Sequence, residues 1–206
     1  MLRRITLSTV VAAAVLCVLS VSIAVAQKGK LRISGDNSWV GFVNGEKVAE
    51  GADWQVPSVS EFTLKDGSAV IAVYVHDAEP GAAGRGGALV DVVLDDGRYF
   101  GSDENWKANA GPPIADRKDG WEKPGFDDSK WEKATQMDQF GSGIWGFGAD
   151  TMRKVLKDPD CTAYWVWAGP NDGADEIYLR FTIGNPTAVH SMGKLAVTWG
   201  SMKSKF

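Results

Sequence analysis

Beyond the first 26 residues, the most apolar stretch is residues 69–75, which consist only of Ala, Val, Ile and Tyr. Seven residues are a typical length for a strand, and β-branched side chains favour that conformation. An apolar run without alternation is typical of a strand that is covered on both faces of its sheet. The sequence therefore predicts a central, doubly buried strand here.

Other short β-prone runs are separated from this strand and from one another by Gly, Asp, Asn and Pro. They lie at residues 31–33, 39–43, 47–48, 61–64, 88–94, 164–168, 177–183 and 195–199. Asn44-Gly45, between two of them, is a strong hairpin signal. The turn residues at 170–173 predict that 164–168 and 177–183 pair with each other. Together these runs predict an all-β sandwich or barrel.

Residues 101–148 differ in composition, since they are rich in Gly, Asp, Lys and Trp and poor in β-branched residues. Four tryptophans within them would not lie in a solvated tail, so we expect an ordered excursion from the sheets.

Residues 1–26 have the pattern of an export signal. Arg3 and Arg4 precede an apolar run at 7–21, and Ala24-Val25-Ala26 has the small-x-small pattern of a cleavage site. An uncleaved anchor is the alternative, because the apolar run approaches the roughly 20 residues of a membrane-spanning helix. The polar residues that follow favour cleavage. We therefore expect a secreted or periplasmic protein with no stable membrane span after cleavage.

Composition narrows the classes of function. Removing the two arginines of residues 1–26 takes the formal net charge from −4 to −6 and leaves 180 residues, enough for one domain. This charge argues against a nucleic-acid partner, which would require clustered Lys and Arg. Cys161 is then the one remaining cysteine, so we expect a buried small side chain and no intramolecular disulfide.

Five strings occur in a fixed order along the chain. They are FVNGEKV at 42–48, GSAVIAV at 67–73, GSDENWK at 101–107, FDDSKWEKA at 126–134 and AYWVW at 163–167, the last followed by Tyr178-Leu179-Arg180. This series resembles galactose-binding-like β-sandwich (jelly-roll) modules, such as those attached to bacterial α-L-rhamnosidases and related glycosidases. Ala69 departs from the usual Asn. The resemblance implies a jelly-roll sandwich over 27–183 and an accessory role without a catalytic domain.

The same strings have a physical interpretation. Asp127 and Asp128 are suited to hold turns through bonds to backbone amides. Trp165 and Trp167 are two residues apart, which predicts that their rings share one strand face. On this interpretation Trp106, Trp121, Trp131, Trp165 and Trp167 are structural. Residues 184–206 lie outside the resemblance and are predicted to be a C-terminal extension with a candidate added strand or docking peptide.

Catalytic patterns are weak. His76 and His190 are the two histidines, and neither has a metal-ligand spacing. Ser142 lacks the Gly-x-Ser-x-Gly setting of a nucleophile elbow. Carboxylates are plentiful, but paired acid–base chemistry needs a deep cleft. We therefore expect no enzyme activity.

Binding patterns are stronger, because sugar sites combine an aromatic platform with polar side chains. The candidate ligand-binding residues are Asp36, Asn37, Trp39, His76, Arg85 and Trp145. A simple turn is the alternative for Asp36-Asn37, and a solvated loop is the alternative for the segment from His76 to Arg85. A structural Ca²⁺ is a further hypothesis, with Asp77, Glu79 and Asp91 as candidate ligands.

The first functional hypothesis is a secreted, non-catalytic, lectin-like module whose partner is a glycan or glycoconjugate. The second is a structural or adhesive extracellular protein that self-associates or binds protein through the same sandwich. An enzyme is the third.

Overall fold

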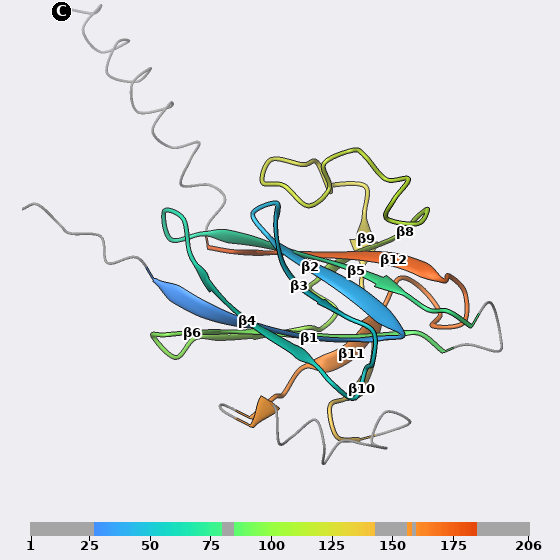
Figure 1. The fold of residues 1–206 in the computed structure, drawn as a ribbon, viewed down its shortest axis with the longest axis horizontal. Coiled ribbons are helices and arrows are strands. Elements are labelled where there is room, and N and C mark those ends of the chain that lie inside the picture. The colour runs from blue at the N-terminus through green and yellow to red at the C-terminus, as the bar shows by residue number, and fades with distance from the viewer. Residues whose placement is uncertain (1–26, 80–84, 143–155, 158–159, 185–206) are drawn as a thin grey trace, which may run out of the picture.

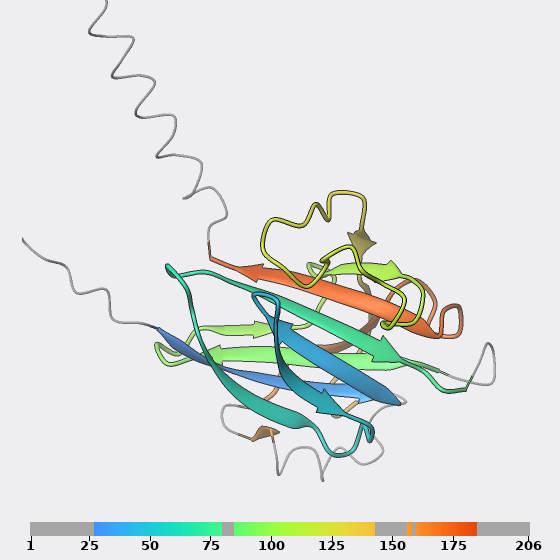
Figure 2. The ribbon, with the colours of Figure 1, turned by 45° about the horizontal axis from the view of Figure 1, so that its top comes forward.

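The computed structural model describes residues 27–79, 85–142, 156–157 and 160–184. They form two antiparallel sheets packed face to face, which confirms the predicted all-β sandwich (Figures 1 and 2). The predicted export signal, Trp145 and almost all of the C-terminal extension lie outside these residues. Within the described part of the chain, no helix is long and apolar enough to cross a membrane.

Sheet A has the strand order β10-β11-β6-β1-β4, and β7 pairs with β6 as well. Its strands are β1 (Lys28–Asp36), β4 (Ser58–Thr63), β6 (Gly87–Leu94), β7 (Tyr99–Gly101), β10 (Thr135–Gln139) and β11 (Tyr164–Trp167). Sheet B has the order β3-β2-β5-β12-β8-β9. Its strands are β2 (Ser38–Val43), β3 (Glu46–Gly51), β5 (Ala69–His76), β8 (Lys107–Ala110), β9 (Glu132–Lys133) and β12 (Glu176–Ile183).

The predicted central strand is confirmed. β5 lies between β2 and β12, and all of its residues except His76 are buried. The predicted hairpin is also confirmed, because Asn44 and Gly45 have φ values of 52° and 87° between β2 and β3. Two successive positive φ angles match the right-handed twist of the paired strands, and Asn-Gly tolerates them.

The predicted pairing of 164–168 with 177–183 is wrong. β11 belongs to sheet A, where it pairs with β6 and β10, whereas β12 lies in sheet B between β5 and β8. The chain between them crosses from one sheet to the other. Turn residues mark where the chain reverses, but they do not determine whether the next strand joins the same sheet.

The main core fills the space between the sheets with alternating side chains from both inner faces. Leu31 and Ile33 of β1 and Val73 and Val75 of β5 are fully buried there. Trp39 belongs to the same core, is 1% exposed, and donates from Nε1 to Ser58 Oγ at 3.1 Å. A Cβ on Gly51 would lie 2.0 Å from the Trp39 ring, so only glycine fits beside this indole.

The outer face of sheet B is covered by residues 111–131, which we call the excursion (Figure 1, above β12). Its Trp121 meets Tyr178 of β12 edge-on, with ring centroids 4.7 Å apart. The Arg117 guanidinium lies 4.1 Å from the Tyr178 ring and 5.0 Å from the Trp131 ring. The prediction of an ordered excursion over 101–148 thus holds for residues 111–131, whose tryptophans cover the aromatic outer face of β12. It is wrong for β8, β9 and β10, which join the sheets, and residues 143–148 lie outside the described part of the chain.

Arg180 of β12 anchors the excursion and is only 3% exposed. Its Nε donates to Asp128 Oδ2 at 2.9 Å, and its Nη1 donates to the carbonyl oxygens of Trp121 and Lys123. Asp127 instead holds a turn by accepting from Ser129 N. The FDD string and the later Arg180 thus form one contact in space, and Asp128 serves as a charge partner rather than as the turn residue predicted.

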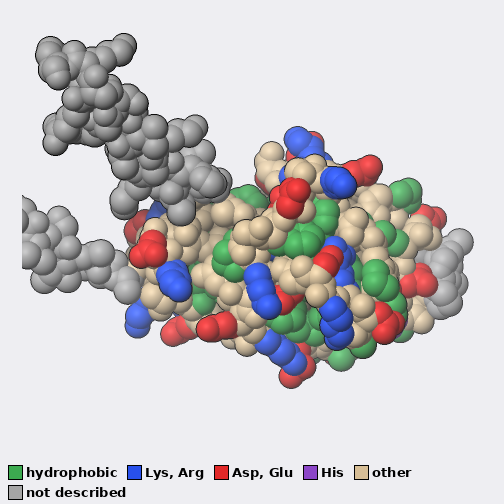
Figure 3. All heavy atoms as spheres, turned by 90° about the horizontal axis from the view of Figure 1, so that it is seen from above, with side chains coloured by type: hydrophobic (Ala, Val, Ile, Leu, Met, Phe, Trp, Pro, Cys, Tyr) green, Lys and Arg blue, Asp and Glu red, His purple; other side chains and the backbone are tan. Residues whose placement is uncertain are grey.

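Figure 3 views the molecule from the side of the excursion, and there basic and acidic side chains are interspersed around apolar ones. No large field of one sign appears on this visible face, which agrees with the small net charge of the chain.

The outer face of sheet A has its own cover. Trp165 packs there with Leu89, Phe140 and Leu156, whereas Trp167 belongs to the main core. The prediction that the Trp165 and Trp167 rings make one aromatic strand face is therefore wrong, because Trp165 packs in the outer cluster and Trp167 in the main core.

A buried ion pair lies beneath that cover. Arg32 Nε and Nη2 donate to both carboxylate oxygens of Asp91, and Arg32 Nη1 donates to the Leu156 carbonyl oxygen at 2.8 Å. Tyr99 donates its hydroxyl to Asp91 Oδ2 at 2.8 Å. Burial and the Asp91 charge raise the pKa of Tyr99, while burial raises the pKa of the neighbouring Cys161 to about 12, which disfavours its thiolate form.

We expect Asp128→Ala to lower the free energy of unfolding by about 2 kcal/mol, because it leaves the buried Arg180 charge without its counter-ion. Urea unfolding followed by tryptophan fluorescence measures this loss. Asp127→Ala is the matched control, since it removes an adjacent, exposed carboxylate that bonds only locally. Equal losses in the two variants would contradict the anchoring role of Arg180.

Candidate functional site

Connections from both sheets meet at one end of the sandwich. The register places Asp36 opposite Gly87 in sheet A, and His76 opposite both Ser38 and Glu176 in sheet B. The residues at these strand ends and in the connections beside them, which we call the polar end, are Asp36, Asn37, His76, Asp77, Glu79, Arg85 and Glu176.

Asn37 ties two of these connections together. Its backbone N–H donates to the His76 carbonyl oxygen at 2.7 Å, and its Oδ1 accepts from Ala78 N at 2.6 Å. Asp77 N in turn donates to the Asp175 carbonyl oxygen, and Gly86 N donates to that of Asn171. The connections that follow β1, β5 and β11 are therefore bonded to one another through their backbones.

Carboxylates are concentrated at this end. Asp36 is half-buried, Asp77 is buried, and Glu79 and Asp53 are exposed. Burial, reinforced by the charges of Asp77, Glu79 and Asp53, raises the pKa of Asp36 to about 6. Like charges held together oppose folding, so this arrangement reduces stability and marks the polar end as a candidate functional site.

A second group of polar side chains lies on the sheet B side of the polar end. His76 Nδ1 lies 3.0 Å from Glu176 Oε1, and Tyr74 donates its hydroxyl to Glu176 Oε2. The His76 side chain is 38% exposed and that of Glu176 is 15% exposed. Burial and the bond to Glu176 raise the pKa of Tyr74, so its hydroxyl remains a donor. His76 therefore presents an exposed ring that is held from behind by a carboxylate.

Three of the residues predicted from sequence, Asp36, Asn37 and His76, lie together. Arg85 is exposed, and the adjoining Gly86 is bonded into the same end. Trp39 is not available as a platform, because it is buried in the main core. β2 points residues 39, 41 and 43 toward the core. The sequence already indicates this, because the apolar Trp39 and Val43 lie on the same face of an alternating strand.

Glu176 and Tyr74 were not predicted. Both lie on the outer face of sheet B, where β5 and β12 pair residue by residue. Alternation within each strand identifies them as outward-facing, but only the register of the two strands brings them together.

The predicted calcium ligands are not grouped. Asp91 is held by Arg32 in the middle of β1 and β6, while Asp77 lies beyond the end of β5. Over the described ranges, no three His, Cys, Asp or Glu side chains are arranged to hold a metal ion. Calcium binding therefore remains a prediction, and the described residues offer no set of ligands for it.

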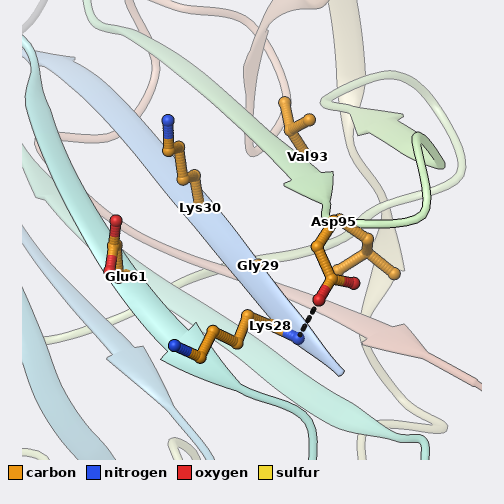
Figure 4. A pocket seen from close by; sticks show the side chains of 7 residues that line it. Lys28, Gly29, Lys30, Glu61, Val93 and Asp95 are labelled. Carbon is orange, nitrogen blue, oxygen red and sulfur yellow. Dashed lines mark hydrogen bonds between the residues drawn. The ribbon is translucent and has the colours of Figure 1, made fainter. Parts of the chain in front are cut away.

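A hollow of about 390 Å³ lies at the opposite end, where β1 begins and β6 ends (Figure 4). Lys28, Lys30 and Glu61 lie around it, and Lys28 N donates to Asp95 Oδ2 at 3.2 Å. Its lining contains no aromatic ring. Residues of this hollow therefore supply control positions for tests of the polar end.

The Asp36 carboxylate gives the polar end a pH dependence. Its folded-state pKa of about 6 lies above the ordinary value of 3.8, so folding favours the protonated form and stability falls as pH rises between these values. Asp36→Asn should therefore stabilise the protein by about 1 kcal/mol at neutral pH, since the half-buried position screens part of the repulsion.

Urea unfolding of Asp36→Asn and the wild type at neutral pH and near pH 4 measures this difference, which should vanish at the lower pH. Glu104→Gln, at an exposed carboxylate outside the polar end, is the control. A gain that is the same at both pH values would show that charge is not its cause.

The chain is similar in sequence to part of a glycosidase. An α-L-rhamnosidase from Streptomyces avermitilis is 32% identical to it over 124 residues, which cover 56% of this chain and 12% of that enzyme. The chain is thus a partial homologue of α-L-rhamnosidase and spans only a small part of its length. This confirms the resemblance seen in the five strings and is consistent with a galactose-binding-like module. No protein-family model matches the chain.

Solved structures similar to the chain include a glycosidase and a lectin. The crystal structure of the Streptomyces avermitilis α-L-rhamnosidase with L-rhamnose has a TM-score of 0.48 at 30% identity, over 58% of this chain and 12% of that one. A lectin from Pleurotus ostreatus, solved in apo form and with GalNAc, has a TM-score of 0.46 at 21% identity, over 58% of this chain and 35% of that one.

Proposed function

We propose that the chain is a secreted, non-catalytic carbohydrate-binding module that takes its glycan at the polar end. The observation that carries the proposal is the convergence of donors and acceptors from three connections on one exposed end of a rigid sandwich. Partial homology to an enzyme that acts on a glycan supports the class of ligand.

The chemistry of the polar end suits hydroxyl groups. Carboxylates such as Glu79 accept hydrogen bonds, Arg85 donates, and the His76 ring offers its Nε2, because its Nδ1 faces Glu176 Oε1. His76 ends β5, Glu79 N is bonded to Asp77 Oδ1, and Gly86 beside Arg85 is bonded to the Asn171 carbonyl oxygen, which lowers the conformational entropy lost on binding. A neutral sugar fits such a surface better than an acidic one, because the local charge is negative.

A non-catalytic role is supported by the extent of the homology. The matched segment is 124 residues and 12% of the rhamnosidase, a length that suits one accessory module and leaves most of the enzyme outside the match. The described carboxylates also have structural partners in several cases, as with Asp91 and Asp128. Hydrolysis of aryl glycosides by the purified chain would contradict this part of the proposal.

Glycan binding can be tested with exposed positions only. We expect His76→Ala and Glu79→Ala to weaken binding by roughly tenfold, because each removes a group that faces solvent at the polar end. A glycan array identifies the ligand, and titration calorimetry measures the change. Lys30→Ala and Glu61→Ala, in the opposite hollow, are matched controls that should leave affinity unchanged.

Failure of the wild type to bind any glycan would overturn the proposal. Concentration-dependent assembly in light scattering, in the absence of glycan, would favour the structural or adhesive alternative instead.

Export is tested separately. We expect a bacterial host to remove residues 1–26, so that the mature protein begins at Gln27. N-terminal sequencing and intact mass of the protein recovered outside the cytoplasm check this. Ala26→Leu should block cleavage, because the peptidase needs a small residue there, whereas Gln27→Asn should leave cleavage unchanged.

A further inference from the structure

A second hollow lies on the flank of the sandwich, between β7 of sheet A and β12 of sheet B. We call it the flank groove. It has a volume of about 510 Å³, and its lining includes Phe100, Phe181, Asp103, Asn105 and Thr162. Phe181 is five residues along β12 from Glu176, which puts the groove roughly 17 Å from the polar end.

The floor of the flank groove is aromatic and rigid. Phe181 and Phe100 are both half-buried, with ring centroids 5.8 Å apart. Behind them the fully buried Trp106 stacks on Phe181 at 5.1 Å and 17° and donates from Nε1 to the Gly101 carbonyl oxygen. The two phenyl rings are thus fixed from the core side and partly open to solvent on the other.

The rim of the flank groove is polar and equally fixed. Asp103 Oδ1 accepts from Asn105 N at 2.8 Å, and Asp103 Oδ2 accepts from Asn105 Nδ2 at 3.0 Å. On the other side Thr162 N donates to the Tyr99 hydroxyl oxygen at 2.9 Å. Asn105 and Thr162 have exposed side chains, so an amide and a hydroxyl border the aromatic floor.

We propose that the flank groove is a second binding site, which takes a neutral pyranoside. A pyranose ring presents C–H groups on a face and hydroxyls around its edge. The phenyl rings of the floor suit the C–H face, and the amide, hydroxyl and carboxylate of the rim suit the sugar hydroxyls. Asp103 and the exposed Glu104 disfavour acidic sugars at this rim. The ligand class rests on the proposed function, but the position of the site does not.

The two sites can be separated by a nuclear magnetic resonance titration of the ¹⁵N-labelled full-length protein with methyl α-L-rhamnoside and methyl β-D-galactoside. We expect saturable shifts of the backbone amides of Gly101, Ser102 and Asn105 beside the groove. Shifts of Asn37, Asp77 and Ala78 report independently on the polar end.

A pair of matched variants tests the position. Thr162→Lys places a long cationic side chain over the groove and should weaken the groove response by about tenfold or more. Thr182→Lys makes the same change at an exposed threonine next to Phe181 in sequence but on the opposite face of β12, and should have no effect.

Each outcome is decisive. Groove shifts that Thr162→Lys removes and Thr182→Lys retains support the inference, whether or not the polar end responds. Shifts confined to the polar end overturn the second site and leave the proposed function standing. Absence of shifts at both places overturns the second site for these sugars, and the glycan array then decides the proposed function.

Discussion

The architecture depends on covering the outer faces of two sheets whose central strands are apolar or aromatic on both sides. A buried arginine anchors each cover. Arg180 binds the excursion to sheet B through Asp128 and two carbonyl oxygens, and Arg32 binds the Leu156 carbonyl oxygen while pairing with Asp91. A guanidinium suits this role because its planar donors can satisfy a carboxylate and backbone oxygens together.

These covers leave the ends and one flank of the sandwich to solvent, and both candidate binding surfaces lie there. At the polar end, backbone bonds between connections hold Asp36 near other carboxylates although this arrangement costs stability. At the flank groove, Trp106 fixes the Phe181 ring from within the core. In both places a rigid interior supports groups that face water, which lowers the entropic cost of binding.

Prediction from sequence succeeded where local chemistry decides. The doubly buried β5 and the Asn44-Gly45 hairpin followed from composition and backbone preference. It failed where the choice of partner strand is not local. The turn residues between β11 and β12 predicted that these strands pair, but they lie in different sheets. The candidate site is predicted in part: Asp36, Asn37 and His76 meet, but Trp39 is buried because the alternation of β2 points it into the core.

The sequence by itself determined that the chain is built of strands, closely where β2, β5, β6, β11 and β12 lie, and which strand is central. The reason is that alternation, β-branching and turn residues act over a few neighbours. Only the tertiary structure decided that Arg180 meets Asp128, that Glu176 stands behind His76, and that Phe100 and Phe181 share a groove. Those contacts join residues 52, 100 and 81 positions apart. Strand register brings His76 to Glu176, whereas the packing of the excursion on sheet B and of the two sheets on each other makes the other two contacts, and no local pattern specifies either.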